Sequence, residues 1–337
     1  MIDVLIAGGG PAGLAAGIHA ALAGLRAVVV EPRSTPVDKA CGEGIMPGGV
    51  AALRALGVEV PGRDLRGIRY RDGARGAEAC FRHGTGLGVR RTELHAALHR
   101  RADALGVETV RGKVGEVRQG ADRVSAGGRT ARWLIAADGL HSPIRRGLGL
   151  DRPDRAPSRY GLRRHFRVAP WSDFVEVHWS RHGEAYVTPV GDDLVGVAVL
   201  SRERRGYDEH LARFPDLAPL LDERPASGVR GAGPLRQRVC RPLAGRVLLV
   251  GDAAGYVDAL TGEGIALALS TAGAAVRALA EGRPKAYPAA WSKLTRRHRL
   301  LTEGLLCATR SPRAARLIVP AAARLPSVFT AAVHALQ

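Results

Sequence analysis

Three glycines near the N-terminus restrict the fold more than any other feature of the sequence. Gly8, Gly10 and Gly13 follow the apolar run IDVLIA and precede the alanine-rich stretch LAAGIHAALAGL. The apolar run is typical of a buried parallel strand, and the alanine-rich stretch predicts a helix. The glycines permit a tight turn and a close approach to a pyrophosphate, to which the helix N-terminus offers free N–H groups. This strand–turn–helix start therefore predicts a dinucleotide site.

Acidic residues end three of the predicted buried strands. Glu31 ends RAVVVE and is placed to accept hydrogen bonds from ribose hydroxyls, which disfavours a 2′-phosphate and favours FAD or NAD over NADP. Asp138-Gly139 follows RWLIAA, and Gly251-Asp252 follows RVLLV. Asp252 can bind a ribityl chain. The helix start TGEGI at 261–265 can direct backbone N–H groups at a flavin that carries negative charge. The three sites together favour FAD.

The order of the predicted elements indicates an α/β fold in which one domain interrupts another. Four alternating strand candidates lie at about 160–168, 174–180, 183–191 and 194–200, and the last two are joined by a hairpin turn signal. We expect a Rossmann-like FAD-binding domain of the glutathione-reductase type at 1–154 and 236–285. An antiparallel-sheet substrate domain is expected at 155–235, and a C-terminal helical tail at 286–337.

Charge and cysteine content restrict the partners and the compartment. The net charge is +18, but the basic residues, of which only four are lysines, are scattered along the chain, so we expect no nucleic-acid partner. An acidic carrier protein fits the charge, although no positional signal supports one. The four cysteines form no C-x-x-C pair, and no apolar run is long enough to span a bilayer, which predicts a reduced, cytoplasmic protein without a transmembrane segment. His95 and His99 have metal-ligand spacing, but we expect a solvated helix face and no metal.

Three motifs carry a family resemblance. GGGPAG with Glu31, IAADGLHSPIRRGLG and VLLVGDAAGYVDALTGEGIALAL stand in the order and spacing of one family of FAD-dependent oxidoreductases. The chain resembles that family, which joins the single-component aromatic hydroxylases of the para-hydroxybenzoate hydroxylase type, the group A flavin monooxygenases, to the geranylgeranyl reductases. The resemblance covers most of residues 1–285 and implies noncovalent FAD, with NAD(P)H as a transient co-substrate.

The resemblance also implies which residues contact the cofactor. Arg91 would contact FAD phosphate or ribityl oxygens, Val114 would place a backbone group at the adenine, and Asp138 would border both FAD and the nicotinamide. The implied contacts are Gly8, Gly10, Pro11, Ala12 and Gly13; Glu31, Pro32 and Arg33; Gly42, Glu43 and Gly44; Asp138 and Gly139; Gly262, Gly264 and Ile265; and Arg91, Val114 and Asp252. In this family the second sheet forms the floor of the substrate pocket, which makes His165, Trp179, Tyr186 and Pro189 candidates, with ordinary sheet packing as the alternative.

No side chain stands out as a catalytic acid or base. Glu43 and Glu263 are candidates because they lie in predicted flavin-side loops, although either can simply cap a helix. Cys41 is either a redox thiol or a small packing residue. The arginine-bearing tail at 310–324 would lie on a membrane surface or, as the more common outcome, dock on the FAD domain.

The resemblance leaves the reaction open. The leading expectation is NAD(P)H-dependent monooxygenation, through a flavin C4a-hydroperoxide formed with oxygen. Its substrate would be an aromatic or polyketide-like small molecule of secondary metabolism. The Cys41-Gly42 loop looks more like the reductase branch, so a flavin-dependent ene-reductase acting on prenyl or polyene chains is the alternative. A basic nucleic-acid- or surface-binding protein with a vestigial flavin fold is a distant third.

Overall fold

The first strand, which the glycine turn follows, lies at the centre of a mainly parallel sheet. In the computed structural model, which describes residues 1–73, 75–154, 156–221 and 225–335, the strand order of this sheet is β17-β18-β11-β1-β2-β8. β9 and β10 extend it through β11 as an antiparallel meander. Its strands are β1 (Ile2–Ala7), β2 (Ala27–Glu31), β8 (Glu108–Arg111), β9 (Val117–Gln119), β10 (Val124–Ala126), β11 (Arg129–Ala136), β17 (Leu243–Ala244) and β18 (Val247–Leu249).

Different layers cover the two faces of this sheet. Helices α1, α3 and α6 pack together over one face, where the alanines and glycines of α1 and α6 let the two helices approach closely. The β9–β10 meander and α4 close the other face around Leu5, Val28 and Leu134. The helices around this sheet are α1 (Pro11–Leu22), α2 (Pro47–Ala55), α3 (Arg91–Ala104), α4 (Pro143–Gly147) and α6 (Gly264–Ala280). The expected α/β fold is confirmed.

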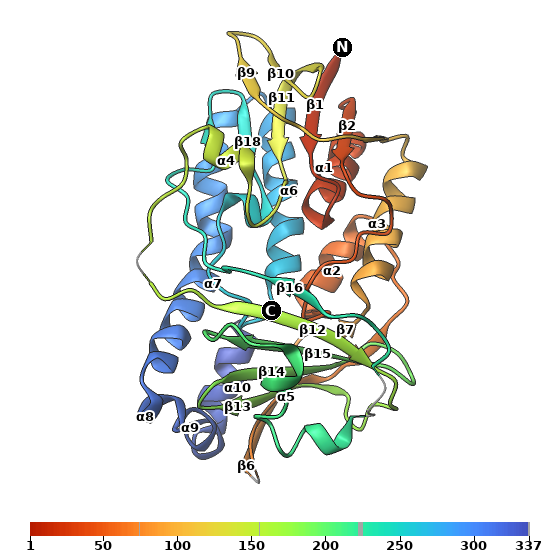
Figure 1. The fold of residues 1–337 in the computed structure, drawn as a ribbon. Coiled ribbons are helices and arrows are strands. Elements are labelled where there is room, and N and C mark those ends of the chain that lie inside the picture. Colours follow the sequence, from red (N-terminus) through yellow and green to blue (C-terminus); the bar gives the residue numbers. More distant parts are fainter. Residues whose placement is uncertain (74, 155, 222–224, 336–337) are drawn as a thin grey trace.

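A second, seven-stranded sheet lies below the first in the view of Figure 1. Its order is β16-β12-β15-β14-β13-β5-β6, and the four strands expected between 160 and 200 are its centre. The small helix α5 (Tyr207–Leu211) packs on β15, and a short third sheet holds β3, β4 and β7. The remaining strands are β3 (Gly44–Ile45), β4 (Arg63–Leu65), β5 (Gly67–Asp72), β6 (Arg75–Cys80), β7 (Gly86–Gly88), β12 (Tyr160–Phe166), β13 (Phe174–Ser180), β14 (Gly183–Pro189), β15 (Val195–Ser201) and β16 (Arg230–Ala232).

Two features of the second sheet differ from expectation. β5 and β6 belong to it, although the expected boundary placed them in the segment 1–154. β5 also pairs in parallel with β13, so the sheet is mixed rather than antiparallel. The long-range pairing of β5 with β13 produces both differences, because it brings an early segment of the chain to the exposed edge of the later strands. Residue 155, where the second domain was expected to begin, lies outside the described residues, as do 222–224 and the last two residues of the tail.

The tail contacts both sheet layers. Helix α7 runs beside α6. The tail was expected to dock on the FAD domain, but α9 and α10 pack on β5 and β6 of the second sheet instead. Among the described residues no single helix is long and apolar enough to cross a bilayer. Two consecutive segments, Arg313–Arg324 and Pro326–His334, reach that length and apolarity only when combined, and they are bent by 100° relative to each other. The tail helices are α7 (Tyr287–Arg310), α8 (Pro312–Ala315), α9 (Ile318–Arg324) and α10 (Pro326–His334).

Candidate functional site

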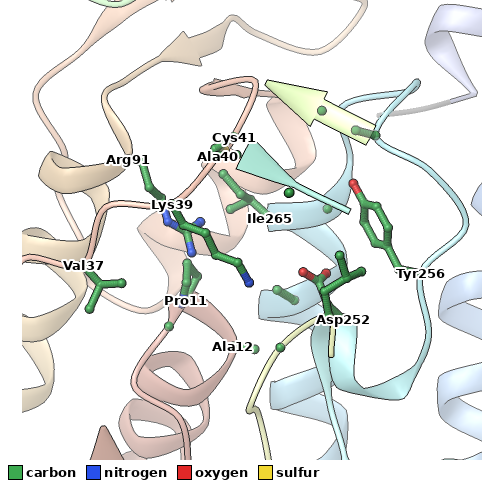
Figure 2. Close-up of a pocket in the computed structure, with 18 of the residues that line it drawn as sticks. Pro11, Ala12, Val37, Lys39, Ala40, Cys41, Arg91, Asp252, Tyr256 and Ile265 are labelled. Carbon is green, nitrogen blue, oxygen red and sulfur yellow. The ribbon is translucent and has the colours of Figure 1, made fainter. Parts of the chain in front are cut away.

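A cavity of about 460 Å³ lies where the glycine turn, the strand ends of the first sheet and the face of the second sheet meet. All the residues expected to contact the cofactor line it except Gly13. Figure 2 labels Pro11, Ala12, Arg91, Asp252 and Ile265 among them. The motifs come from segments as far apart as Gly8 and Ile265, and they converge because the carboxyl ends of parallel strands share one edge of a sheet. The structure thus brings the expected cofactor residues together in one place.

Gly13 packs inside the turn instead of lining the cavity. A Cβ atom at Gly13 would lie 1.8 Å from the carbonyl oxygen of Gly8, and Gly8 itself has a φ of +101°. The two glycines let α1 start directly against the end of β1. Gly10 holds the N-cap position without a side chain, so the first N–H groups of α1 stay open toward the cavity. Such a helix start favours an anion.

Glu31 closes the turn from the next strand. Its carboxylate accepts hydrogen bonds from Gly9 N at 2.7 Å and from the backbone N and Nε of Arg33 at 3.0 and 2.7 Å. Burial would raise the pKa of this carboxyl, but the hydrogen bonds from Arg33 and Gly9 outweigh it and lower the pKa. Glu31 is therefore a fixed anion at the end of β2.

Cations gather at the same end of the cavity. Arg91 begins α3, and Lys39, which was not among the expected contacts, extends into the cavity toward Asp252 (Figure 2). Burial lowers the pKa of Lys39, Asp252 opposes this shift, and Arg91 and Arg33 add to it. The sequence held a signal that could have marked Lys39 as a site residue. Lysine is rare in this arginine-rich chain, and two of its four lysines, Lys39 and Lys113, line the cavity.

Glu43 is held in a buried network. It is the one described non-glycine residue with positive φ, 60°, and its side chain is 1 % exposed. Its Oε1 accepts from Arg91 N at 2.8 Å, and its Oε2 accepts from His165 Nε2 at 2.6 Å. Arg163, another residue that the sequence did not single out, is 1 % exposed; it donates to His165 Nδ1 at 3.0 Å and to Asp38. Glu43 thus satisfies the N-terminus of α3, as its capping alternative expected, and joins the second sheet to the cavity loop.

The loop after β11, which carries Asp138, lies against the loop after β18, which carries Asp252; we call them the aspartate loops. Asp138 Oδ2 accepts from Ile144 N at 3.1 Å, Oδ1 is buried without a partner among the described residues, and burial raises the pKa of this carboxyl. Arg145 donates to Leu140 O at 3.0 Å in one loop and to Ala253 O at 3.1 Å in the other. This guanidinium fixes both loops, although nothing in the local sequence pattern marks Arg145 among its many arginine neighbours.

The start of α6 forms the opposite wall. Gly262, with φ +71°, Gly264 and Ile265 line the cavity. Glu263 does not join them. Its Oε2 accepts from His298 Nδ1 at 2.8 Å, so this candidate acid is paired with α7 and makes no side-chain cap. The prediction that Glu263 faces the flavin is wrong, because its side chain turns away from the cavity to pair with His298 of α7.

Only one of the four candidate substrate residues lines a cavity. Tyr186 does, and its hydroxyl donates to Leu260 O at 3.0 Å. His165 belongs to the Glu43 network, Trp179 packs edge-on against Tyr70, and Pro189 lies against Gly88. The strand register places His165, Trp179 and Tyr186 on one face of the sheet, whereas Pro189, three residues after Tyr186, points to the other face. Of the four, Tyr186 is the one that lines the FAD cavity.

A second, apolar cavity of about 280 Å³ adjoins the first. It lies between the second sheet and the tail helices α7, α9 and α10. Met46, Val175, Tyr186 and Gly262 line both cavities, so the two cavities meet at these residues. Ile68, Val177, Leu305, Ile318 and Phe329 are among the apolar side chains of the second one.

His95 was expected on a solvated helix face, but it is buried beneath the glycine turn. It is 1 % exposed, its Nε2 lies 2.9 Å from Gly9 O, and the rings of His95 and His99 are 6.3 Å apart. The expected spacing holds, but His95 points inward because α3 packs on α1. Among the described residues no group of three His, Cys, Asp or Glu side chains could hold a metal ion.

Acid is expected to destabilise the fold through His95. Burial lowers the pKa of His95 from 6.5 to about 4, so the unfolded chain takes up a proton that the folded chain does not. This stabilising contribution is complete above pH 6.5 and is lost as the pH falls toward 4, at up to about 1.4 kcal/mol per pH unit. Urea unfolding at several pH values measures it. His95→Gln, whose amide can still donate to Gly9 O, should flatten the profile over that range, and an unchanged slope would contradict the assignment.

The cavity suits FAD. The open start of α1 with Arg91 and Lys39 matches a diphosphate, and Glu31 matches a ribose. The unpartnered Asp138 Oδ1 and the carboxylate of Asp252 match hydroxyl donors of a ribityl chain. A cradle of this kind is built for a dinucleotide whose far end reaches α6.

Comparisons with known proteins agree with this geometry. Residues 1–215 match the FAD binding domain family. The chain is 31% identical to a menaquinone reductase of Mycolicibacterium smegmatis over 99% of this chain and 91% of that protein. It is 30% identical to digeranylgeranylglycerophospholipid reductase 1 of Methanothermobacter thermautotrophicus over 78% of this chain and 73% of that protein. The structure of the flavin-dependent brominase Bmp2 shares the fold, with a TM-score of 0.82 and 18% identity over 99% of this chain and 93% of that one.

The sequence match spans more than half of the chain, and the relatives are similar over most of its length. The expected resemblance to the FAD oxidoreductases is therefore confirmed, as is FAD as the cofactor. The chain belongs to the FAD binding domain family and is an FAD-dependent oxidoreductase.

Proposed function

We propose that this enzyme reduces a carbon–carbon double bond in a long, apolar, isoprenoid-like chain. The observation that carries the proposal is the apolar cavity beside the FAD site. A compact aromatic substrate would need only the first cavity, whereas a chain bound next to the flavin can continue past Met46 and Tyr186 into the second. The names of the two reductase relatives, which refer to a prenylated quinone and a prenylated lipid, support the same class of substrate.

Bound FAD in its reduced form supplies a hydride, and saturation of the double bond also needs one proton. Cys41 and Tyr256 line the FAD cavity and carry exchangeable protons (Figure 2). Burial raises the pKa of the Cys41 thiol and of the Tyr256 hydroxyl, so both groups hold their protons at neutral pH. We assign proton delivery to one of these two groups. Glu43 and Glu263 are unsuited because partners already occupy their carboxylates.

The remaining cavity residues bind and orient. The N–H groups at the start of α6 face the flavin end of the cavity and stabilise negative charge there. Arg163 and His165 hold the loop of Cys41 by way of Glu43 and Asp38. We further propose NAD(P)H as the electron donor, bound transiently, with Asp138 at the border of its site.

Oxygen transfer remains the second candidate. The fold similarity to a flavin-dependent brominase favours a reaction of reduced flavin with oxygen, which is the reaction that the sequence led us to expect first. The large apolar volume beside the flavin makes reduction the better supported of the two.

The fate of the substrate distinguishes them. The FAD-loaded enzyme is reduced without oxygen and mixed with a menaquinone that carries an unsaturated isoprenoid chain in detergent, and flavin absorbance is followed. We expect flavin oxidation together with a product two hydrogens heavier, and this mass gain should persist after the quinone ring is reoxidised in air. A product that gains an oxygen atom in oxygenated buffer, or a chain left unsaturated, would refute the proposal.

Blocking the second cavity should select against long chains. Val177 lines only that cavity, so Val177→Phe narrows it without touching the FAD site. We expect turnover of the long-chain substrate to fall on the order of tenfold or more, with turnover of a two-isoprene alkene and FAD content unchanged. Val177→Ala is the matched control and should accept both. Equal losses for the two chain lengths would contradict a role of this cavity in binding.

A further inference from the structure

The outer side of the C-terminal helices is apolar and surrounded by arginines. Leu317, Leu325 and Val328 are 62%, 55% and 60% exposed, although they belong to a region whose inner side is packed on β5 and β6. Arg316 and Arg324 are exposed beside them. From residue 304 to the C-terminus the sequence contains four arginines and no aspartate or glutamate. We call the exposed surface of residues 313–332 the tail surface.

The tail surface is also the rim of the second cavity. Leu325 and Val328 line this cavity and are more than half exposed, so the cavity opens at the tail surface. Ala321 and Ala332 are likewise exposed and part of the lining. At its inner end the cavity meets Met46 and Tyr186 at the FAD site. The second cavity therefore extends from the outside of α9 and α10 to residues that also line the FAD cavity.

We propose that the tail surface docks on an anionic lipid bilayer and that the second cavity opens into it. Exposed leucine and valine side chains with a cationic border are the features by which a helix lies in a membrane interface. Each arginine near an anionic surface adds to the attraction, and here no carboxylate within the segment cancels it.

The same observations disfavour a second copy of the chain as the occupant. Two molecules of net charge +18 repel each other, and two tail surfaces would bring arginines together without acids to pair them. The docking itself follows from the surface alone. Its purpose, delivery of a bilayer-dissolved alkene to the flavin without passage through water, rests on the proposed function.

Flotation with vesicles tests the docking directly. The full-length, FAD-loaded protein is mixed with vesicles of phosphatidylcholine alone or of equal parts phosphatidylcholine and phosphatidylglycerol, with no substrate present. We expect flotation with the anionic vesicles, much weaker flotation with the neutral ones, and loss of binding as salt is raised. Equal partition into both kinds of vesicle, or into neither, would overturn the proposal.

Surface variants identify the face that binds. Leu325→Glu combined with Val328→Glu should reduce anionic-vesicle binding at least tenfold, and Arg316→Ser with Arg324→Ser should reduce it about fivefold for each arginine removed. The matched controls are Leu22→Glu, a 52% exposed leucine on α1, and Arg54→Ser with Arg100→Ser on α2 and α3. All variants alter exposed side chains, and FAD absorbance and melting temperature check the fold. Controls that lose binding as strongly as the tail variants would contradict the assignment.

Two readouts separate this proposal from the function. If the tail variants lose vesicle binding but the product gains oxygen, the docking proposal is supported and the proposed reductase function is refuted. If sedimentation instead shows a dimer that the Leu325→Glu, Val328→Glu variant dissociates, and vesicles do not bind, the tail surface joins two copies and the docking is refuted.

Discussion

Gly13→Ala is expected to leave a protein that no longer retains FAD and is strongly destabilised. The new methyl carbon would lie 1.8 Å from the carbonyl oxygen of Gly8 and 3.3 Å from the side chain of Ala137. Gly8 has little room to retreat, because it packs on the Ala137 carbonyl group at a φ of +101°. The start of α1 would have to move away from β1, which removes the N–H groups that face the cavity. We expect the free energy of unfolding to fall by about 3–5 kcal/mol.

Denaturant unfolding and the flavin absorbance of the purified protein measure the two effects. Gly304→Ala is an informative control because a methyl group there meets open space within helix α7. That substitution should raise the stability by up to about 1 kcal/mol and leave FAD in place. A Gly13→Ala protein with wild-type stability and bound FAD would show that the turn is looser than its geometry indicates.

The cofactor site could be predicted because its chemistry is encoded locally. Gly8, Asp138 and Asp252 each follow a buried apolar strand closely, and α1 and α4 begin soon after the first two. Parallel strands then bring their carboxyl ends to one edge whatever the rest of the chain does. A short motif thus determines both the turn and the position of the turn in the fold.

Features that depend on long-range packing could not be read in the same way. β5 and β6 contain RYRD and RGAEAC, whose arginines and small residues give no clear alternation. They join the sheet because β5 pairs with β13 and β6 pairs with β5. His95 looked solvated because its burial is produced by α1 and not by α3 itself. The partners of Glu43 and Glu263 lie 122 and 35 residues away, so no local pattern reveals that their carboxylates are already taken.

Arg145 shows how a single buried side chain can join two motifs that the sequence treats as separate. Its guanidinium is 1 % exposed and donates to Asp151, to Gln237 Oε1 at 2.8 Å and to three carbonyl oxygens in the aspartate loops. No other residue type offers five donors in a rigid planar arrangement. The loops that carry Asp138 and Asp252 therefore keep their spacing only while arginine occupies this position.

Arg145→Lys is accordingly expected to be nearly as damaging as the glycine substitution. A lysine keeps the charge but can satisfy at most three of these five acceptor groups, which leaves carbonyl oxygens of the buried loops without their partner. We expect the free energy of unfolding to fall by about 3 kcal/mol. FAD affinity should fall as well, because the two loops that carry Asp138 and Asp252 into the cavity lose their common anchor. Arg146→Lys, on the adjacent exposed side chain, should change stability by less than about 0.5 kcal/mol. If the two variants behaved alike in denaturant and in flavin titration, the hydrogen bonds of Arg145 would not be what holds the two loops together. Their spacing would then have to come from backbone pairing alone.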